Sequence, residues 1–211
     1  MKPTLRLLIC LCAISLCPAV SPAGGYLENA DANTIGFYFE ECGWCNELYA
    51  APFSTQTGHV VLARPTASEI DGYVFGLDYF GPVVQTTIDL NGAAPVNLAI
   101  ELGAYHVMLS EPLPTTEATV LATVGLFITG STPGEIYGRG LPGSGDCQLG
   151  YFGPGGFVDC YWPICGITMP GDPCPGMICE SAYPLAVVNG PAPVATDRAS
   201  WSAVKSIYGG F

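Results

Sequence analysis

Apolar and polar residues alternate along much of the chain, as they do in β-strands with one buried and one solvated face. In the segment DGYVFGLDYFG, Tyr73, Phe75 and Leu77 fall on one side, while Gly76 and Asp78 fall on the other. Similar runs are IGFYFEE, HVVLARP, VVQTTIDLNG, AIELGAYHVMLSE, ATVLATVGLFITG, GEIYGRG, GGFVDCYW and YPLAVVNG. With little helix between them, these runs predict an all-β fold, an antiparallel β-sandwich.

Only two segments favour helix. NELYAAPF is long enough for one or two turns before Pro52 ends it. Near the C-terminus, Trp201, Val204 and Tyr208 repeat at intervals of three and four, as on one face of a helix. We therefore expect a short helix or a tail in residues 191–211.

The N-terminus has the layout of a secretory signal peptide. Lys2 and Arg6 give a positive start, LLICLCAISL supplies an apolar run, and small residues precede the expected cleavage after Ala23. The apolar run is about half as long as a membrane-spanning helix, which needs about 20 residues. We therefore expect residues 1–23 to be removed and the protein to be secreted, into the periplasm or outside the cell, without a membrane span.

The chain is strongly acidic, with a formal net charge of −12 at pH 7. Once the signal peptide is removed, four basic and eighteen acidic residues remain, which gives 4 − 18 = −14. Nucleic acid is excluded as a partner, because phosphates would be repelled and the chain has no basic stripe. Acidity of this kind is more typical of a soluble surface than of a specific cation site.

Five of the ten cysteines fall between Cys147 and Cys179, in a stretch crowded with Gly and Pro. Such a stretch buries little apolar surface, so we expect disulfides to order it, as in secreted proteins. The predicted organisation is a single sandwich domain over residues 24–190, which includes a Cys-rich insertion over residues 141–182, followed by a tail over residues 191–211.

Seven cysteines remain after the signal peptide, and all are disulfide candidates: Cys42, Cys45, Cys147, Cys160, Cys165, Cys174 and Cys179. Because seven is odd, one thiol must be free, buried or bonded to another chain. Closure of short loops favours bonds from Cys147 to Cys160 or Cys165, and from Cys174 to Cys179 or to one of these. The later spacings do not suit a zinc site.

Cys42-Gly-Trp-Cys45 has the spacing of a redox motif. In thioredoxin-like proteins a long helix in a βαβ frame comes directly after such a motif, whereas Pro52 would soon end a helix that began at Cys45. A structural disulfide is favoured instead, either between these two cysteines or from each to a distant partner.

The order of the strand-like segments resembles that of a known family. IGFYFEE, HVVLARP, DGYVFGLDY and LPTTEATVLATVGLFITG occur in the same order as in secreted bacterial sandwiches of the cohesin-like, Ig-like kind. The ending SWSAVKSIYGGF is similar to endings of uncharacterised secreted bacterial proteins. The cohesin-like resemblance covers about half of the chain after the signal peptide and implies a fold, not a function. It carries over no dockerin-contacting residue, and the Cys-rich stretch departs from cohesins.

Residues for common hydrolytic sites are sparse. The two histidines, His59 and His106, lie in strand-like runs without a G-x-S-x-G motif, so a Ser-His-Asp hydrolase is disfavoured. A glycoside hydrolase needs only two carboxylates at a suitable separation. The carboxylates available for that role are Glu40, Glu41, Asp78, Asp89 and Glu101. With eighteen acidic residues some pair will always lie near, so we assign no catalytic residue.

Calcium is the metal that a secreted acidic chain could most readily meet. Asn29, Asp31, Asn33 and Glu40 fall at positions 1, 3, 5 and 12 of an EF-hand-like count. Thr34 stands where that loop requires Gly, and the second half is strand-like instead of helical. We therefore predict no metal ligand and no cofactor, with calcium as the alternative.

Aromatic residues are a softer indication of a binding surface. Several fall in loop-like sequence, where exposed rings could stack on sugars: Trp44, Tyr151, Phe152, Tyr161 and Trp162. The alternative, which the Cys-rich context favours, is that such rings pack as a small core beneath the loops.

Together these observations predict a secreted, non-catalytic β-sandwich that binds an extracellular protein or glycan. Two alternatives remain. One is a structural or assembly subunit of an extracellular layer or filament, which would associate with itself through sheet edges or the odd cysteine. The other is an extracellular glycoside hydrolase.

Overall fold

The computed structural model describes residues 32–39, 45–142, 147–160, 162 and 184–190. These residues form strands and turns, and none of them belongs to a helix that could cross a membrane. The prediction of an all-β fold is confirmed. The strands are β1 (Thr34–Phe39), β2 (Glu47–Leu48), β3 (Ser54–Ala63), β4 (Glu69–Phe80), β5 (Val83–Leu90), β6 (Val96–Asn97), β7 (Ala104–Pro114), β8 (Ala118–Ile128), β9 (Gly134–Arg139), β10 (Leu141–Pro142), β11 (Cys147–Gln148), β12 (Gly150–Gly153), β13 (Gly156–Asp159) and β14 (Ala186–Val188).

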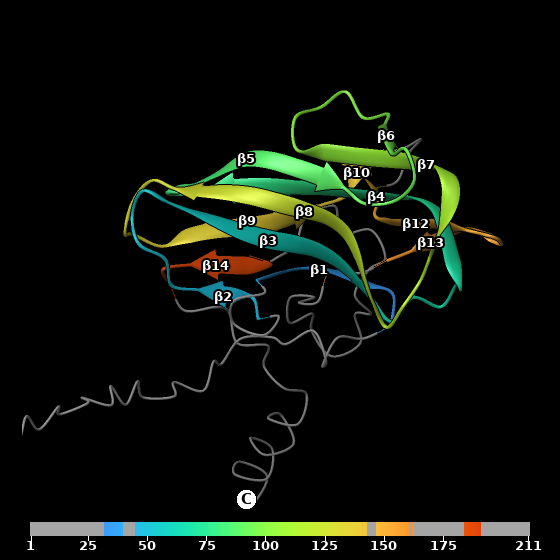
Figure 1. Cartoon of the computed structure of the whole chain (residues 1–211), viewed down its shortest axis with the longest axis horizontal. Coiled ribbons are helices and arrows are strands. Elements are labelled where there is room, and N and C mark those ends of the chain that lie inside the picture. Colours follow the sequence, from blue (N-terminus) through green and yellow to red (C-terminus); the bar gives the residue numbers. More distant parts are fainter. Residues whose placement is uncertain (1–31, 40–44, 143–146, 161, 163–183, 191–211) are drawn as a thin grey trace, which may run out of the picture.

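The strands form two main sheets that pack face to face, as Figure 1 shows. One sheet has four strands in the order β1-β3-β8-β5. The other has eight strands: its main path runs β13-β12-β4-β9-β14-β2, while β7 joins β4 and β6 joins β7. The pairings within these sheets are antiparallel apart from the short one between β14 and β2. The predicted antiparallel β-sandwich is therefore observed.

The core lies between the inner faces of the two sheets. Phe37 of β1 and Leu62 of β3 come from one sheet, and Phe75 of β4 and Ile136 of β9 come from the other. All four side chains are fully or almost fully buried. Burying each such side chain stabilises the fold by about 1.5–3 kcal/mol.

A bulge explains why the alternation is not continuous along β8. The register with β3 shifts between Val60 and Val61, whose partners are Ala122 and Val120, so Leu121 is left as an extra residue. Leu121 and Ala122 are both fully buried. A bulge lets two consecutive residues face the same side, so β8 keeps apolar residues toward the core on both sides of the shift.

The predicted turn of helix in NELYAAPF is not observed. Residues Glu47–Leu48 instead form β2, which pairs in parallel with Val187 and Val188 of β14. A one- or two-turn helix is unstable by itself, whereas a distant strand can supply backbone partners directly. Because β14 also pairs with β9, the prediction that YPLAVVNG returns to the sheet is confirmed. The signal peptide and the predicted C-terminal helix or tail lie outside the described residues.

The first part of the predicted Cys-rich insertion belongs to the main sheet. Strand β12 pairs with β4, and Tyr151 on it is fully buried. The Tyr151 hydroxyl donates to Asn33 Oδ1 at 3.0 Å and accepts from the Thr66 N–H at 3.2 Å. Strand pairing and core contacts therefore order this segment, for which the sequence analysis had relied mainly on disulfides. Residues 163–183 lie outside the described residues.

Candidate functional site

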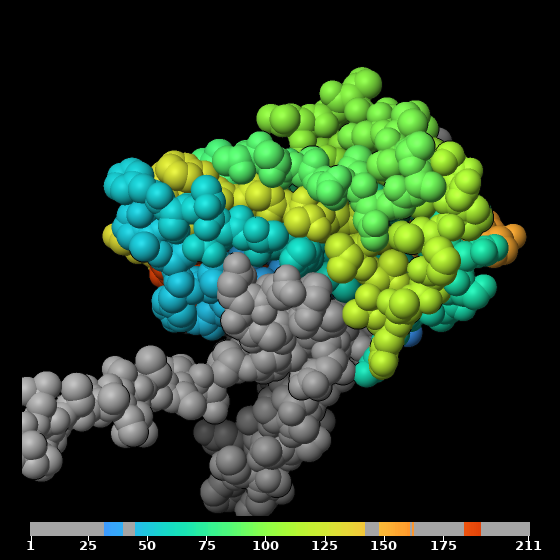
Figure 2. All heavy atoms as spheres, viewed as in Figure 1, coloured from blue at the N-terminus to red at the C-terminus, as the bar shows by residue number. Residues whose placement is uncertain are grey.

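Four aliphatic side chains stand exposed in one segment between β5 and β7. Val96 and Leu98 are each 55% exposed, Leu102 is 98% exposed and Ile100 is 100% exposed. They occupy alternate positions: Val96 belongs to β6, and Leu102 lies in the turn that the Ala104 N–H closes with the Glu101 carbonyl at 3.2 Å. We call this row of four side chains the apolar ridge. The segment that carries it projects beyond the strands in Figure 1 and belongs to the green protrusion at the top of Figure 2.

Residues between the ridge positions hold the segment to the sheet. The Asn97 side chain donates to the Ala104 carbonyl at 3.0 Å and accepts from the His106 N–H at 2.8 Å. The Leu98 N–H donates to the His106 carbonyl at 2.7 Å. Val96 and Leu98 therefore belong to a segment that is held to β7 by the Asn97 side chain and by the Leu98 N–H.

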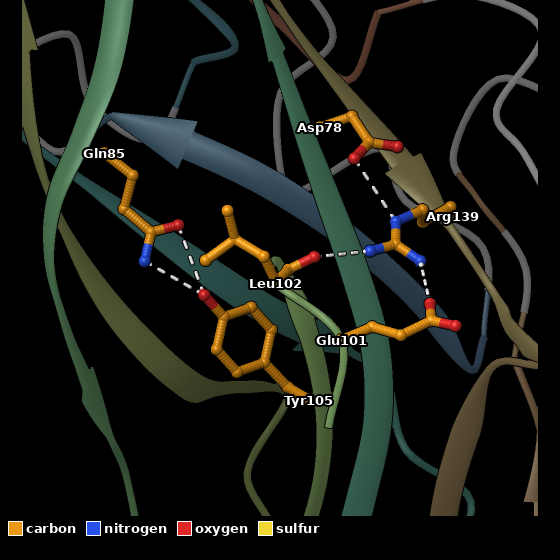
Figure 3. A network of polar contacts seen from close by, with 6 residues as sticks. All are labelled: Asp78, Gln85, Glu101, Leu102, Tyr105 and Arg139. Carbon is orange, nitrogen blue, oxygen red and sulfur yellow. Dashed lines mark hydrogen bonds and ion pairs between the residues drawn. The ribbon is translucent and has the colours of Figure 1, made fainter. Parts of the chain in front are cut away.

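Arg139 of β9 holds the second half of the ridge, as Figure 3 shows. Its guanidinium donates to the Leu102 carbonyl at 2.7 Å and to Glu101 Oε2 at 3.2 Å. Its Nε donates to Asp78 Oδ1 on β4 at 3.2 Å. The Arg139 side chain is only 17% exposed, so these charge-assisted bonds are partly shielded from solvent. We call Arg139, Asp78 and Glu101 the arginine bracket.

Two glycines make the bracket feasible. Gly76 of β4 pairs with Ala104 of β7 on one side and with Arg139 on the other. A Cβ atom at Gly76 would lie only 2.6 Å from Arg139 Cγ. Gly103, directly after the ridge, has a φ of +74°, and a Cβ atom there would lie 2.6 Å from the Leu77 carbonyl oxygen. The lack of side chains at both positions lets the ridge segment lie close to β4 and β9.

A second polar contact in Figure 3 joins the two sheets beneath the ridge. Tyr105 comes after the ridge on β7, and Gln85 lies on β5 of the opposite sheet. The Gln85 amide donates to the Tyr105 hydroxyl at 2.9 Å, and that hydroxyl lies 3.2 Å from Gln85 Oε1. This contact fixes the beginning of β7 relative to the opposite sheet.

A satellite cluster supports the ridge segment on the outer face of the large sheet. His106 stacks on Phe152 with ring centroids 5.7 Å apart, and Phe152 meets Phe157 edge to face at 5.0 Å. Phe152, Phe157 and Ala99 pack against a cluster of three buried residues: Val74, Ala104 and Leu141. Because Ala99 is a ridge-segment residue, the cluster anchors the middle of that segment.

A second group of exposed apolar side chains is aromatic. Tyr49, Phe53 and Phe80 are each more than half exposed. Phe53 has a φ of +60°, which bulky residues rarely adopt, and its N–H donates to the Ile128 carbonyl at the end of β8. Phe80 meets Tyr137 edge to face, with ring centroids 5.4 Å apart. Phe80 and Tyr137 are therefore in contact, and we call these two rings the aromatic group.

Of the rings named from the sequence, those that the structure describes do not belong to this exposed group. Tyr151 and Trp162 are core residues, 0% and 5% exposed, so neither offers a ring face to a ligand. Gly138 makes room for Trp162, because a Cβ atom there would lie 2.6 Å from its ring. Phe152 is half-buried in the satellite cluster. Trp44 and Tyr161 lie outside the described residues.

The structure distinguishes two of the seven cysteines. Cys45 is disulfide-bonded, whereas Cys160 is a free thiol buried in the core. The bond from Cys147 to Cys160, one of the two predicted for Cys147, is therefore not formed. Burial, with a smaller contribution from Asp159, raises the pKa of the Cys160 thiol and keeps it protonated at neutral pH. Of the other five candidates, Cys147 is the first residue of β11, and four lie outside the described residues: Cys42, Cys165, Cys174 and Cys179.

The candidate acid–base residues within the described part of the chain do not converge on a catalytic arrangement. His59 is buried on β3, whereas His106 stacks in the satellite cluster on the other sheet. Asp78 and Glu101 do come together, but both carboxylates accept bonds from Arg139. Asp89 lies on β5, in the other sheet. Two of the carboxylates lie outside the described residues: Glu40 and Glu41.

Among the described residues, no group of three or more His, Cys, Asp or Glu side chains is placed to hold a metal ion. In the EF-hand-like segment, Asn33 Oδ1 accepts from the Thr66 N–H at 2.9 Å and from the Tyr151 hydroxyl. Thr34 is the first residue of β1. The other residues of that segment lie outside the described residues: Asn29, Asp31 and Glu40.

Sequence reasoning missed the apolar ridge, although a signal is present. Alternation placed residues 99–111 in one strand, but β7 begins only at Ala104. The apolar residues take even numbers from Val96 to Leu102 and odd numbers from Tyr105 onward. One strand cannot keep both runs on one face. The change of parity therefore marks the point where the exposed ridge gives way to the core strand.

No protein-family model and no curated protein matches this chain. Among solved structures, it is similar to the sixth cohesin of scaffoldin B from Acetivibrio cellulolyticus, in complex with a mutant Cel5 dockerin. That match has a TM-score of 0.40 and 14% identity, over 57% of this chain and 87% of the other. CaCohA2 from Clostridium acetobutylicum matches with a TM-score of 0.40 and 9% identity, over 63% and 86%.

Proposed function

We propose that the protein is a secreted, non-catalytic module that binds a partner protein through the apolar ridge. The observation that carries this proposal is the exposure of four aliphatic side chains on a segment that hydrogen bonds and ion pairs otherwise hold in place. Single exposed apolar residues are common on soluble proteins, whereas a contiguous exposed apolar patch is typical of an interaction site.

The ridge offers substantial binding energy. Burying a Leu or Ile side chain is worth about 1.5–3 kcal/mol. Ile100 and Leu102 are almost completely exposed, so a partner that covers them can gain energy on that scale from each. A few such side chains commonly supply most of the affinity of a protein interface.

The arginine bracket prepares the ridge for binding. Ordering a flexible side chain at an interface costs about 0.5–1.5 kcal/mol. Because Arg139 holds the Leu102 carbonyl and Asn97 holds the start of the segment, much of the ordering is complete before a partner arrives. Arg139 is therefore a positioning residue in this proposal.

The chemistry of the ridge favours a protein partner over a glycan. Val, Leu and Ile have neither a flat ring for stacking nor polar groups that could bond sugar hydroxyls. Catalysis has no comparable support, since Asp78 and Glu101 are both engaged with Arg139.

A glycan is the second candidate, at the aromatic group. The Tyr137 hydroxyl donates to Glu135 Oε2 at 3.2 Å beside the exposed Phe80 ring. Burial and the Glu135 carboxylate raise the pKa of Tyr137, so this hydroxyl stays protonated. Titration with neutral oligosaccharides should then show binding that Phe80→Ala weakens and Val84→Ser does not. No binding to the wild-type protein would remove this candidate.

Export is part of the proposal and has a direct test. Intact mass of the protein from its native source should correspond to loss of residues 1–23, and reduction should add mass for each disulfide. A chain that retains the leader inside the cell would contradict export.

The ridge itself is tested with the double variant Ile100→Ser/Leu102→Ser and the control Val84→Ser. Val84 is 48% exposed on β5, outside the ridge. A partner captured from the secreted fraction would be purified and titrated against all three proteins. We expect the double variant to lose at least about tenfold in affinity and the control less than about twofold. Full affinity in a correctly folded double variant would overturn the proposal.

A further inference from the structure

We infer that the partner surface is apolar at its centre and carries Lys or Arg side chains beside that centre. This inference rests on the proposed function of the ridge. Residues 65–138, which include the ridge and strands β4 to β8, contain no Lys or Arg. Their acidic residues are Glu69, Asp71, Asp78, Asp89, Glu101, Glu111, Glu117 and Glu135. The charged residues of the ridge segment and of strands β4 to β8 are therefore all acidic, and the basic partners that the structure gives them come from outside that range, Arg64 for Glu117 and Arg139 for Asp78 and Glu101.

The arginine bracket does not reverse this charge. Arg139 pairs with both Asp78 and Glu101, so the three groups together carry a net charge of −1. The side chains of Asp78 and Glu101 are 42% and 55% exposed, whereas that of Arg139 is 17% exposed. An approaching partner therefore meets the carboxylates more readily than the guanidinium.

Glu101 lies within the ridge segment, between Ile100 and Leu102. A partner Lys or Arg can lay its aliphatic stem along apolar side chains and bring its charged end to a carboxylate. A neutral partner would remove water from Glu101 without replacing its interactions. An acidic partner would be repelled. Charge complementarity thus selects a basic partner surface.

The same charges argue against a second copy of the chain as the occupant. Without residues 1–23, each copy carries a formal net charge of 4 − 18 = −14, and two ridges in contact would bring their Glu101 side chains together. A ridge-dependent dimer of the purified protein at low salt would therefore overturn the inference.

Short peptides of defined charge test the inference directly. The probes are fluorescent heptapeptides in which Leu alternates with Lys, Ser or Glu, so that an extended peptide carries Leu on one side and the other residue type on the opposite side. Binding is measured by anisotropy at about 0.01 M and about 0.1 M NaCl, where the Debye length falls from roughly 30 to roughly 10 Å. The proteins are wild type, Ile100→Ser/Leu102→Ser, Glu101→Gln and the control Glu69→Gln. Glu69 is exposed at the start of β4, seven residues before Gly76.

We expect the Leu–Lys peptide to bind wild type most tightly and to weaken at the higher salt concentration. Glu101→Gln should reduce its affinity about two- to fivefold, the scale of one exposed ion pair, and Glu69→Gln should reduce it much less. Equal binding of the Leu–Ser peptide, or equal effects of the two Gln variants, would overturn the inference. If either result were found and Ile100→Ser/Leu102→Ser still abolished peptide binding, the inference would fail and the proposed function would stand. If the double variant bound the Leu–Lys peptide as tightly as wild type does, the peptide would be held by general charge attraction. That result would count against both the inference and the proposed function.

Discussion

Arg139 reaches the ridge segment by lying across Gly76, its direct partner on the neighbouring strand β4. Directly paired residues on adjacent strands point to the same face of a sheet. A side chain at position 76 would therefore occupy the space that the Arg139 stem uses. From there the guanidinium binds Asp78 on β4 and the Leu102 carbonyl in the ridge segment. The exposed ridge thus depends on a position without a side chain.

Gly76→Ala should loosen the ridge segment. The added Cβ would lie 2.6 Å from Arg139 Cγ and 3.0 Å from the Arg139 carbonyl oxygen, so the side chain must move. Overpacking of this kind typically costs about 1–3 kcal/mol. We expect the free energy of unfolding to fall by about that amount, and amide hydrogen exchange in residues 98–103 to become faster by mass spectrometry.

Gly155→Ala is the matched control for this substitution. A Cβ atom at the exposed Gly155 meets no atom within 4 Å. Its effect on stability should stay within about 0.5 kcal/mol, with unchanged exchange in the ridge segment. If Gly76→Ala lowered stability and left exchange in residues 98–103 at the wild-type rate, Arg139 would not be what holds the ridge.

Tyr151→Phe should destabilise the junction between β12 and the chain around β1. The Tyr151 hydroxyl donates to Asn33 Oδ1 and accepts from the N–H groups of Thr66 and Ala67, at 3.0 to 3.3 Å. Removal of a buried bonding group leaves its partners unsatisfied, at about 1–3 kcal/mol. The free energy of unfolding, measured with urea, should fall by about that amount.

Tyr137→Phe provides the comparison, because it also removes one tyrosine hydroxyl. That hydroxyl bonds to Glu135, and Tyr137 is partly exposed, so water can replace the bond. We expect a change within about 0.5 kcal/mol for this variant. Equal effects of the two substitutions would show that the Tyr151 hydroxyl has no special role.

The strands of the sandwich could be predicted because burial imposes a local pattern. On β4, Tyr73, Phe75 and Leu77 are fully or almost fully buried on alternate positions, as the sequence indicates. The other face was predicted to be solvated, but Val74 and Gly76 on it are buried as well, because the satellite cluster and Arg139 cover them. β2 could not be predicted, since two residues form a strand here only through pairing with Val187 and Val188, far along the chain. Local alternation contains no information about such a partner.

The candidate site could be predicted only in part, for a related reason. Asp78 and Glu101 were named as carboxylates, but their common partner Arg139 comes from another strand. Tyr151 and Trp162 lie in a Gly-rich stretch that is typical of loops, yet contacts with distant segments bury both. The exposure of a side chain depends on what packs over it, which sequence alternation alone does not specify.

Cys160 should be inert in the folded protein and reactive after unfolding. It is buried, and burial raises the pKa of its thiol, so neither access nor thiolate is available at pH 8. We expect no labelling by iodoacetamide in native buffer and labelling at Cys160 in denaturant without reductant, located by peptide mass spectrometry. Rapid native labelling at Cys160, or a disulfide at that position, would contradict the structure.

Alkaline pH should destabilise the fold through its buried tyrosines. Burial raises the pKa of Tyr38 from 10.0 to about 12, and it also raises the pKa of Tyr73 and Tyr79. The unfolded chain loses these protons first, so stability is intact below pH 10 and falls as the pH rises from 10 toward 12. Tyr38 alone contributes up to about 2–3 kcal/mol of this loss. Urea unfolding between pH 8 and 12 should show the decline in wild type and a shallower one in Tyr38→Phe, which has no proton to lose at that position. A parallel decline in both proteins would show that Tyr38 is accessible to solvent in the folded state.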